Sequence, residues 1–164
     1  MLRRILVPLD GSRLGEQALP LAVEIASRLE AGLWLVRVSR AFELTSGPGS
    51  FVPSYVERVR ELLGGEAHEY LGGLQARLAR PGLAVRSVVL EGPVVAAIAG
   101  YACAQRIDLI VMATHGRAGL SRWVHHNVAE GVRGCADCPT LLVPCRTDRA
   151  APAARPRAAQ PPVR

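Results

Sequence analysis

The sequence predicts a single α/β domain built on a doubly wound parallel sheet of five strands. Short apolar runs of strand length alternate with longer segments of helical spacing along most of the chain. Hydrophobic residues make up 49% of the chain but aromatic residues only 4%, so Val, Leu, Ile and Ala must fill the core, as in a buried parallel sheet. At 164 residues the chain has the length of one such domain.

The first predicted strand spans residues 5–7 and leads into the turn Pro8-Leu9-Asp10-Gly11-Ser12. Asp10 or Ser12 can cap the helix that follows, because Asp and Ser side chains accept hydrogen bonds from the first N–H groups of a helix. We expect this helix to run to about Leu29. Pro20 lies inside it and predicts a kink or a local break.

The second strand is predicted at residues 33–38, followed by a loop at 40–53 that is rich in Gly and Pro. A long helix is predicted over residues 55–80 and ends at Pro81-Gly82. The pairs Gly64-Gly65 and Gly72-Gly73 weaken it, since each Gly inside a helix costs about 1 kcal/mol relative to Ala.

The remaining elements form a βαβ pattern. A strand at 85–90 is followed by a helix that opens at Gly92-Pro93 and ends near Arg106. Residues 108–112 form the fourth strand, 114–119 a turn containing Gly116 and Gly119, and a helix starts at Ser121 and stops before Pro139. Residues 140–143 form the last strand. The turn lies at the carboxyl end of a strand, where open α/β sheets bind ligands, and in front of a helix N-terminus, which attracts anions.

Two segments resemble the universal stress protein family. Residues 4–12, RILVPLDGS, are close to the opening strand and turn of the family, and residues 108–144 resemble its C-terminal signature. That signature has Gly-x-x-Gly, nine residues, and then Gly-Ser or Gly-Thr. Here Ala113 and Gly116 occupy the two Gly positions, and His126-Asn127 replaces the final pair. The resemblance covers residues 3 to 144 and implies a flavodoxin-like or adenine nucleotide alpha hydrolase-like fold of strand order 3-2-1-4-5.

Many members of this family bind ATP, so the resemblance also implies a nucleotide site. At the switch point of a 3-2-1-4-5 sheet, Asp10 and the loop 113–116 meet at one crevice. The Cβ and ring of His126 obstruct close approach of a phosphate to the backbone, so we expect ATP binding to be weak or absent, although the Asn127 amide can still donate. The residues that the resemblance assigns to the site are Pro8, Leu9, Asp10, Val38, Met112, Ala113, Gly116, Arg117, His126, Asn127 and Val128.

No set of residues in the sequence indicates catalysis. His115 lies in the loop, but the motif contains no Ser or Cys nucleophile with an orienting group. We therefore expect a non-enzymatic regulatory or binding module of the stress response. One alternative is a dimeric interaction protein that binds no nucleotide.

The other alternative is a thiol or metal sensor that uses the CxxC pair Cys135 and Cys138. This pair is predicted at a helix C-terminus, where the helix dipole opposes a thiolate. A zinc site would need two further ligands, for which His125, His126 and Cys145 are the nearby candidates. A purely structural role, in which the pair forms a helix-ending turn, is also consistent with the sequence.

Charge and composition set the C-terminal residues apart. The chain carries a net charge of +6 with no Lys, and residues 146–164 hold five Arg and one Asp. We expect this Ala/Pro/Arg-rich tail to be disordered, to contact anionic surfaces weakly, and to leave residues 1–145 as the folded domain. No motif indicates specific nucleic-acid binding.

Location and assembly can also be predicted. No apolar run approaches the roughly 20 residues that a membrane helix needs, and Asp10 interrupts the only N-terminal candidate for a signal peptide. Four Cys without an export signal indicate a cytoplasmic protein with reduced thiols. The last strand, Thr140 to Val143, is an apolar and uncharged sheet edge, so we expect a homodimer through it.

Overall fold

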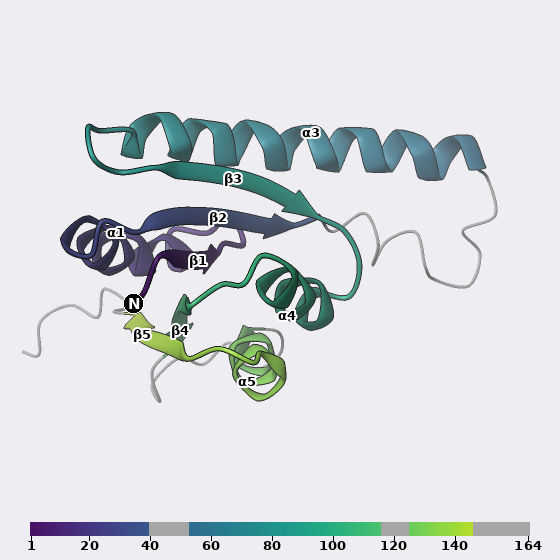
Figure 1. Ribbon diagram of the computed structural model, residues 1–164. Coiled ribbons are helices and arrows are strands. Elements are labelled where there is room, and N and C mark those ends of the chain that lie inside the picture. Colours follow the sequence, from purple (N-terminus) through teal and green to yellow (C-terminus); the bar gives the residue numbers. More distant parts are fainter. Residues whose placement is uncertain (40–52, 116–124, 146–164) are drawn as a thin grey trace, which may run out of the picture.

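The computed structural model describes residues 1–39, 53–115 and 125–145, and its centre is a parallel sheet (Figure 1). The strands are β1 (Arg4–Pro8), β2 (Gly32–Val38), β3 (Val85–Leu90), β4 (Leu109–His115) and β5 (Thr140–Cys145). They are hydrogen-bonded in the order β3-β2-β1-β4-β5, and every neighbouring pair is parallel. This confirms the predicted fold class and strand order.

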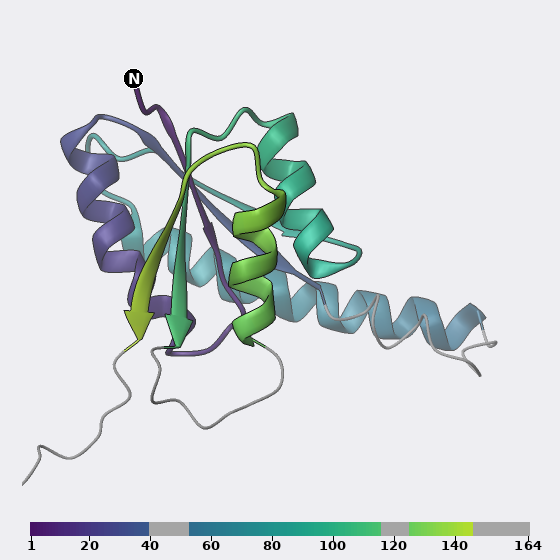
Figure 2. The same cartoon turned by 90° about the horizontal axis from the view of Figure 1, so that it is seen from below.

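Helices cover both faces of the sheet (Figures 1 and 2). The helices are α1 (Leu19–Arg28), α3 (Pro53–Leu78), α4 (Val94–Ala104) and α5 (His125–Cys135), and a 3-10 turn η1 (Gly15–Ala18) precedes α1. Alternate strand residues divide the core in two. Ile5 and Val7 of β1 are buried with residues of α1 and α3, whereas Leu6 is buried with residues of α4 and α5.

The first predicted helix is broken, as Pro20 indicated, and its start was predicted wrongly. The α-helical part begins only at Leu19, so that Pro20 lies in its first turn, where a missing N–H is tolerated. The expected side-chain cap belongs to the preceding turn: Ser12 Oγ accepts a hydrogen bond from the Gly15 N–H at 3.0 Å. α1 itself has no side-chain cap.

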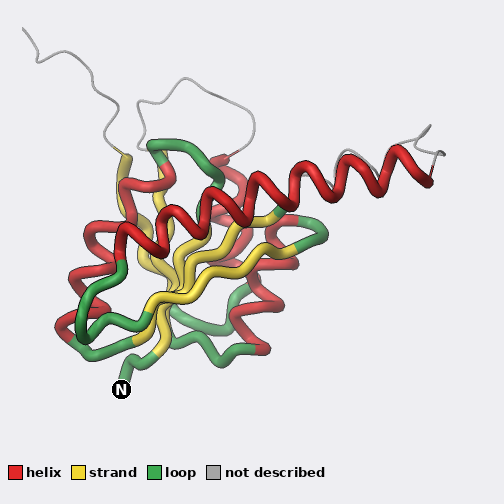
Figure 3. Tube along the Cα trace, turned by 90° about the horizontal axis from the view of Figure 1, so that it is seen from above, coloured by secondary structure: helices red, strands yellow, loops and turns green. Residues whose placement is uncertain are grey.

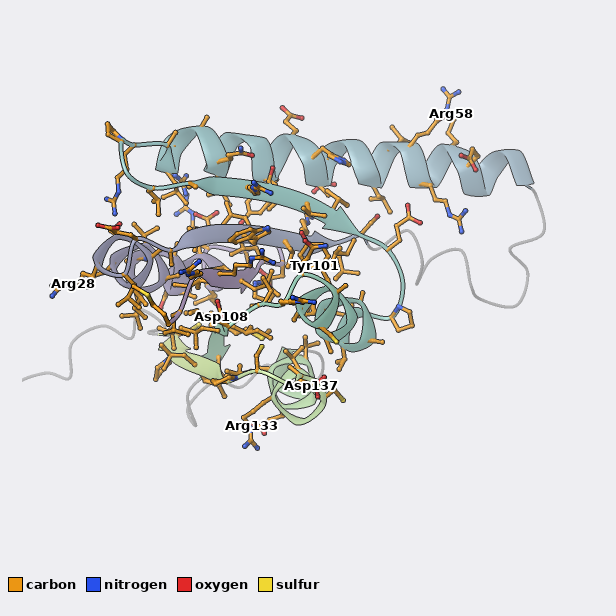
Figure 4. All side chains as sticks on the ribbon, in the orientation of Figure 1. Arg28, Arg58, Tyr101, Asp108, Arg133 and Asp137 are labelled. Atoms are coloured by element: carbon orange, nitrogen blue, oxygen red, sulfur yellow. The ribbon has the colours of Figure 1, made fainter. Side chains whose placement is uncertain are left out.

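Helix α3 is longer than the sheet that it covers. It runs without interruption through both Gly pairs, and Ala67, Leu71 and Leu74 form its buried face. Its N-terminal part, which carries the exposed Arg58 labelled in Figure 4, extends beyond the sheet at the carboxyl ends of the strands (Figures 1 and 3). Packing of the second half of the helix on β2 and β3 therefore outweighs the low helix propensity of Gly.

Two boundaries in the C-terminal half differ from the prediction. β4 continues through Thr114 and His115, because both residues pair with β5, in register with Pro144 and Cys145. Ala113 is consequently a strand residue and not part of a loop. α5 ends at Cys135, four residues before the proline that was expected to stop it.

The pairing between β1 and β4 is short. Only Ile5↔Leu109 and Leu6↔Ile110 are in register across it, against five residue pairs between β1 and β2 and six between β4 and β5. This seam lies where the order of the strands reverses, which is the usual position of a ligand-binding crevice in such sheets.

Within the three described ranges, none of the helices combines the length and the apolar character that crossing a membrane requires.

Candidate functional site

A cavity of about 320 Å³ opens at the carboxyl ends of β1, β2 and β4, between the sheet and the helices α4 and α5. Its volume lies at the lower end of the range of small-molecule sites. Val36, Val38, Ile98 and Met112 give it apolar walls, and Asp10 lines it at the end of β1. Arg37 also lines it, but the guanidinium of this residue lies against α3 on the other face of the sheet. A mainly apolar cavity with a few polar groups is typical of a small-molecule site.

The cavity gathers most of the residues that the sequence assigned to a site. Seven of them line it: Pro8, Leu9, Asp10, Val38, Met112, Ala113 and Val128. Gly116 and Arg117 lie outside the described residues. His126 and Asn127 belong to the first turn of α5, but their side chains are outside the description. That these residues bind a ligand stays a prediction.

Six further residues line the cavity without having been predicted: Gly15, Val36, Arg37, Val94, Ile98 and Ala129. Some had a signal in the sequence. Val36 lies two positions before Val38 and so shares its face of the strand, and Val94 and Ile98 are four residues apart on one helix face. Arg37 had no such signal.

The turn after β1 is held in a defined shape. The Leu9 N–H donates to the Val36 carbonyl at 2.8 Å and prolongs the pairing of β1 with β2. Asp10 Oδ1 accepts a hydrogen bond from the Ser12 N–H at 2.9 Å, and Gly11 has the left-handed φ of +86°. A Cβ on Gly15 would lie 2.5 Å from Asp10 Oδ1, so only Gly lets η1 approach the carboxylate this closely.

Arg37 reaches this turn from β2. Its side chain is only 14% exposed and forms an ion pair with Glu66 of α3, with 3.2 Å between Nη2 and Oε1. The guanidinium carbon lies 5.2 Å from the centre of the Tyr70 ring. Tyr70 in turn donates to Glu16 at 3.1 Å, and burial, reinforced by the Glu16 charge, raises the pKa of Tyr70 well above its usual value. The phenol therefore remains a hydrogen-bond donor at neutral pH.

The N-terminus of α5 lies at the carboxyl ends of β4 and β5 (Figure 2). The first N–H groups of a helix have no partner within the helix and attract anions. Val128 and Ala129, one turn into α5, line the cavity. The cavity thus extends from Asp10 at the end of β1 toward a helix N-terminus on the other side of the seam.

The cysteines offer little support for a thiol or metal site. Cys135 is exposed, and burial, with smaller contributions from the Asp108 and Asp137 charges, raises the pKa of Cys138. A raised pKa disfavours the thiolate that metal binding and thiol exchange need. Among the side chains that the structure describes, no three His, Cys, Asp or Glu residues are grouped so as to hold a metal ion.

Comparison with known proteins identifies the family. The model of the universal stress protein family matches residues 1–144. Universal stress protein MJ0531 of Methanocaldococcus jannaschii is 32% identical over 143 residues, which are 86% of this chain and 81% of the relative. Universal stress protein YxiE of Bacillus subtilis is 26% identical, with 87% of this chain and 99% of the relative covered.

Solved structures share the same fold. Universal stress protein UspA from Lactobacillus plantarum superposes with a TM-score of 0.71 at 25% identity, covering 86% of this chain and 97% of that one. An Arabidopsis thaliana family protein with AMP bound has a TM-score of 0.58 at 16% identity, covering 89% and 94% of the two chains. A universal stress protein in complex with cAMP has a TM-score of 0.54 at 18% identity, covering 88% and 98%. With the strand order, the opening turn and the family model in agreement, the chain belongs to the universal stress protein family.

Proposed function

We propose that this chain is a non-enzymatic module of the stress response that binds an adenine nucleotide in the cavity at the β1–β4 seam. The observation that carries the proposal is the lining of that cavity. Asp10 and Val38 from one half of the sheet and Met112, Ala113 and Val128 from the other surround a single space of about 320 Å³.

The chemistry of the cavity suits a nucleoside. Its apolar side chains accommodate a flat base, while the Asp10 carboxylate can accept hydrogen bonds from amino or hydroxyl groups. The N-terminus of α5 is the natural place for the phosphates. Two structures of the same fold support the choice of an adenine nucleotide, since one holds AMP and the other cAMP.

We further propose that the hold on the phosphates is weak. His126 and Asn127 stand in the first turn of α5, where the family motif has Gly followed by Ser or Thr. A side chain at position 126 removes the close backbone approach that Gly permits. Losing one hydrogen bond to a charged phosphate costs about 1.5–3 kcal/mol, or roughly one to two decades of affinity. ATP binding should therefore be weak or absent.

The assembly that we propose is a cytoplasmic homodimer through β5. This strand is one edge of the sheet, and its Leu141 is 36% exposed. An apolar edge strand with unpaired backbone groups favours pairing with a second copy.

Calorimetric titration with ATP and AMP tests the proposed function, together with mass spectrometry of small molecules released from freshly purified, denatured protein. The double change His126→Gly with Asn127→Ser should strengthen ATP binding about ten- to a hundredfold. If neither nucleotide binds the unmodified chain nor this variant, the cavity is not a nucleotide site. Submicromolar binding of ATP by the unmodified chain would instead show that His126 and Asn127 do not weaken the binding of the phosphates.

A further inference from the structure

Arg37 lies in β2 between two residues that line the cavity, but its side chain points to the opposite face of the sheet. Side chains alternate along a strand, so Val36 and Val38 face the cavity under α4 and α5, while Arg37 faces α3. Its side chain is only 14% exposed, with Glu66 Oε1 3.2 Å from Nη2 and the centre of the Tyr70 ring 5.2 Å from the guanidinium carbon. Arg37 is therefore held by α3 behind the wall of the cavity.

The guanidinium supports the turn that follows β1. A Cβ built on Gly11 would lie 3.2 Å from the guanidinium carbon of Arg37, 3.3 Å from Nη2 and 3.4 Å from Nη1. These nearly equal distances mean that the flat face of the guanidinium is turned toward Gly11. Gly11 also has a φ of +86°, which L side chains rarely adopt, so the turn needs Gly both for its backbone shape and for this contact. The residue before it, Asp10, lines the cavity.

The far end of the turn is also fastened to α3. Glu16 of η1 accepts a hydrogen bond from the Tyr70 hydroxyl at 3.1 Å and pairs with Arg77 at 2.8 Å. Tyr70 therefore takes part in both attachments, through its ring beside the guanidinium and through its hydroxyl. The segment that carries Asp10 is fixed at two points before any ligand arrives, which lowers the entropic cost of using its carboxylate for binding.

Resting on the proposed nucleotide site, we propose that Arg37 is a positioning residue for that site, which acts on the nucleotide through the Asp10 turn and does not touch the ligand. The Asp10 carboxylate can accept hydrogen bonds from amino or hydroxyl groups of a nucleotide. Removing the guanidinium takes away the surface on which Gly11 rests and lets the turn move, so the carboxylate is less well placed. The resulting loss of affinity should therefore depend on the carboxylate at position 10.

A double-mutant cycle of Arg37→Met and Asp10→Asn tests this coupling. Met keeps most of the length and apolar volume of Arg37, and it leaves no buried charge unpaired because the Glu66 side chain is 64% exposed. Asn keeps an oxygen that can accept the Ser12 N–H, now bonded to Asp10 Oδ1 at 2.9 Å, and removes the charge. We expect Arg37→Met to lower AMP affinity about tenfold in the unmodified chain and less than about twofold in the Asp10→Asn background.

Arg86→Met is the matched control. Like Arg37, Arg86 is a strand arginine beside an aromatic ring, 5.5 Å from the centre of Trp34, but it does not line the cavity and lies in β3, which is not a neighbour of β1. It should leave AMP affinity unchanged. Amide exchange of the free chain gives a second readout. The Ser12 and Gly15 N–H groups, which donate to side chains of the turn, should exchange faster in Arg37→Met but not in Arg86→Met.

The proposed function and this inference can fail separately. If the unmodified chain does not bind AMP, both are wrong. If it binds AMP, only the role of Arg37 is refuted when Arg37→Met binds equally well, or when its loss has the same size with and without Asp10→Asn. If Arg37→Met does not fold, the same cycle with Arg37→Lys decides. Lys keeps the charge beside Glu66 and lacks the flat group on which Gly11 rests, so its loss of affinity should likewise disappear in the Asp10→Asn background.

Discussion

Replacing Gly131 with Ala should press α4 and α5 apart, since the side chain of Val95 in α4 packs directly against the backbone of α5 at Gly131. A Cβ on Gly131 would lie 2.9 Å from Cγ2 and 3.3 Å from Cγ1 of Val95. Carbon atoms in contact are normally about 3.5–4.0 Å apart, so one of the helices must move or Val95 must leave its rotamer. Overpacking of this kind costs about 1–3 kcal/mol.

Gly100 provides an internal standard for this change. Gly131 is the seventh of eleven residues in α5, Gly100 is the seventh of eleven in α4, and a Cβ on Gly100 would meet no atom within 4 Å. Both changes to Ala gain about 1 kcal/mol in helix propensity, and only Gly131→Ala incurs the overlap. Gly100→Ala should therefore be stabilising by about 1 kcal/mol, and Gly131→Ala should be about 1–3 kcal/mol less stable than Gly100→Ala.

Urea unfolding of the two variants measures that difference, which corresponds to about 2–4 °C of melting temperature for each kcal/mol. Adding Val95→Ala removes the overlapping methyl groups and should restore the propensity gain of Gly131→Ala, giving a coupling energy of at least about 1 kcal/mol. If Gly131→Ala proved as stabilising as Gly100→Ala, the packing of α4 on α5 would be looser than the structure has it.

Three further changes test other parts of the molecule. Asp108, labelled in Figure 4, accepts hydrogen bonds at Oδ2 from the N–H groups of Arg3 and Arg4 at 2.8 and 2.9 Å. These bonds lower the pKa of the Asp108 carboxyl. Asp108→Ala should therefore reduce the free energy of unfolding by about 1–3 kcal/mol at pH 7. The pKa of this carboxyl is lower in the folded than in the unfolded chain. The stability difference between the unmodified chain and Asp108→Ala should therefore persist above about pH 4 and shrink as the pH falls below that value. Urea unfolding at pH 7 and below about pH 4 measures it. If β5 pairs two copies, light scattering should give twice the chain mass of 17.5 kDa for the unmodified protein and the single chain mass for Leu141→Lys. Leu141 is chosen because it is exposed, whereas Leu142 packs against the core. Deleting residues 146–164, which lie outside the described ranges, should leave the melting temperature unchanged and abolish retention on heparin.

The strands were predictable from sequence because a buried parallel sheet needs apolar runs, and two of the runs have clear ends: residues 5–7 lie between Arg4 and Pro8, and residues 140–143 between Pro139 and Pro144. Their order came from the resemblance of two motifs, since periodicity alone does not specify which strands are neighbours. The end of β4 was missed for a physical reason: Thr114 and His115 are polar and precede a Gly. Their place in the sheet follows from pairing with β5, which a local pattern does not reveal.

The residues of the candidate site could be predicted where they belong to the family motifs. They could not be predicted where contacts between distant segments bring a residue to its place. Asp10, Val38 and Ala113 line the cavity at the expected places. Arg37, flanked by two valines, has the alternation of a strand with its polar side chain in solvent. Instead α3 lies over that face of β2 and brings Glu66 and Tyr70 against the guanidinium. Only the packing of a distant helix explains why this arginine is largely buried.

The short register between β1 and β4 makes this seam the line along which the sheet has the fewest paired residues. Strands β3, β2 and β1 form one block and β4 and β5 another, joined in register only at Ile5↔Leu109 and Leu6↔Ile110. Small opening motions should concentrate at this line, so its amides are expected to exchange with solvent sooner than those between β2 and β3. A molecule in the cavity would touch Asp10 on one block and Met112 on the other, and would stabilise the seam between them. Slower amide exchange along the β1–β4 seam would then report occupancy of the cavity directly, whatever the occupant is.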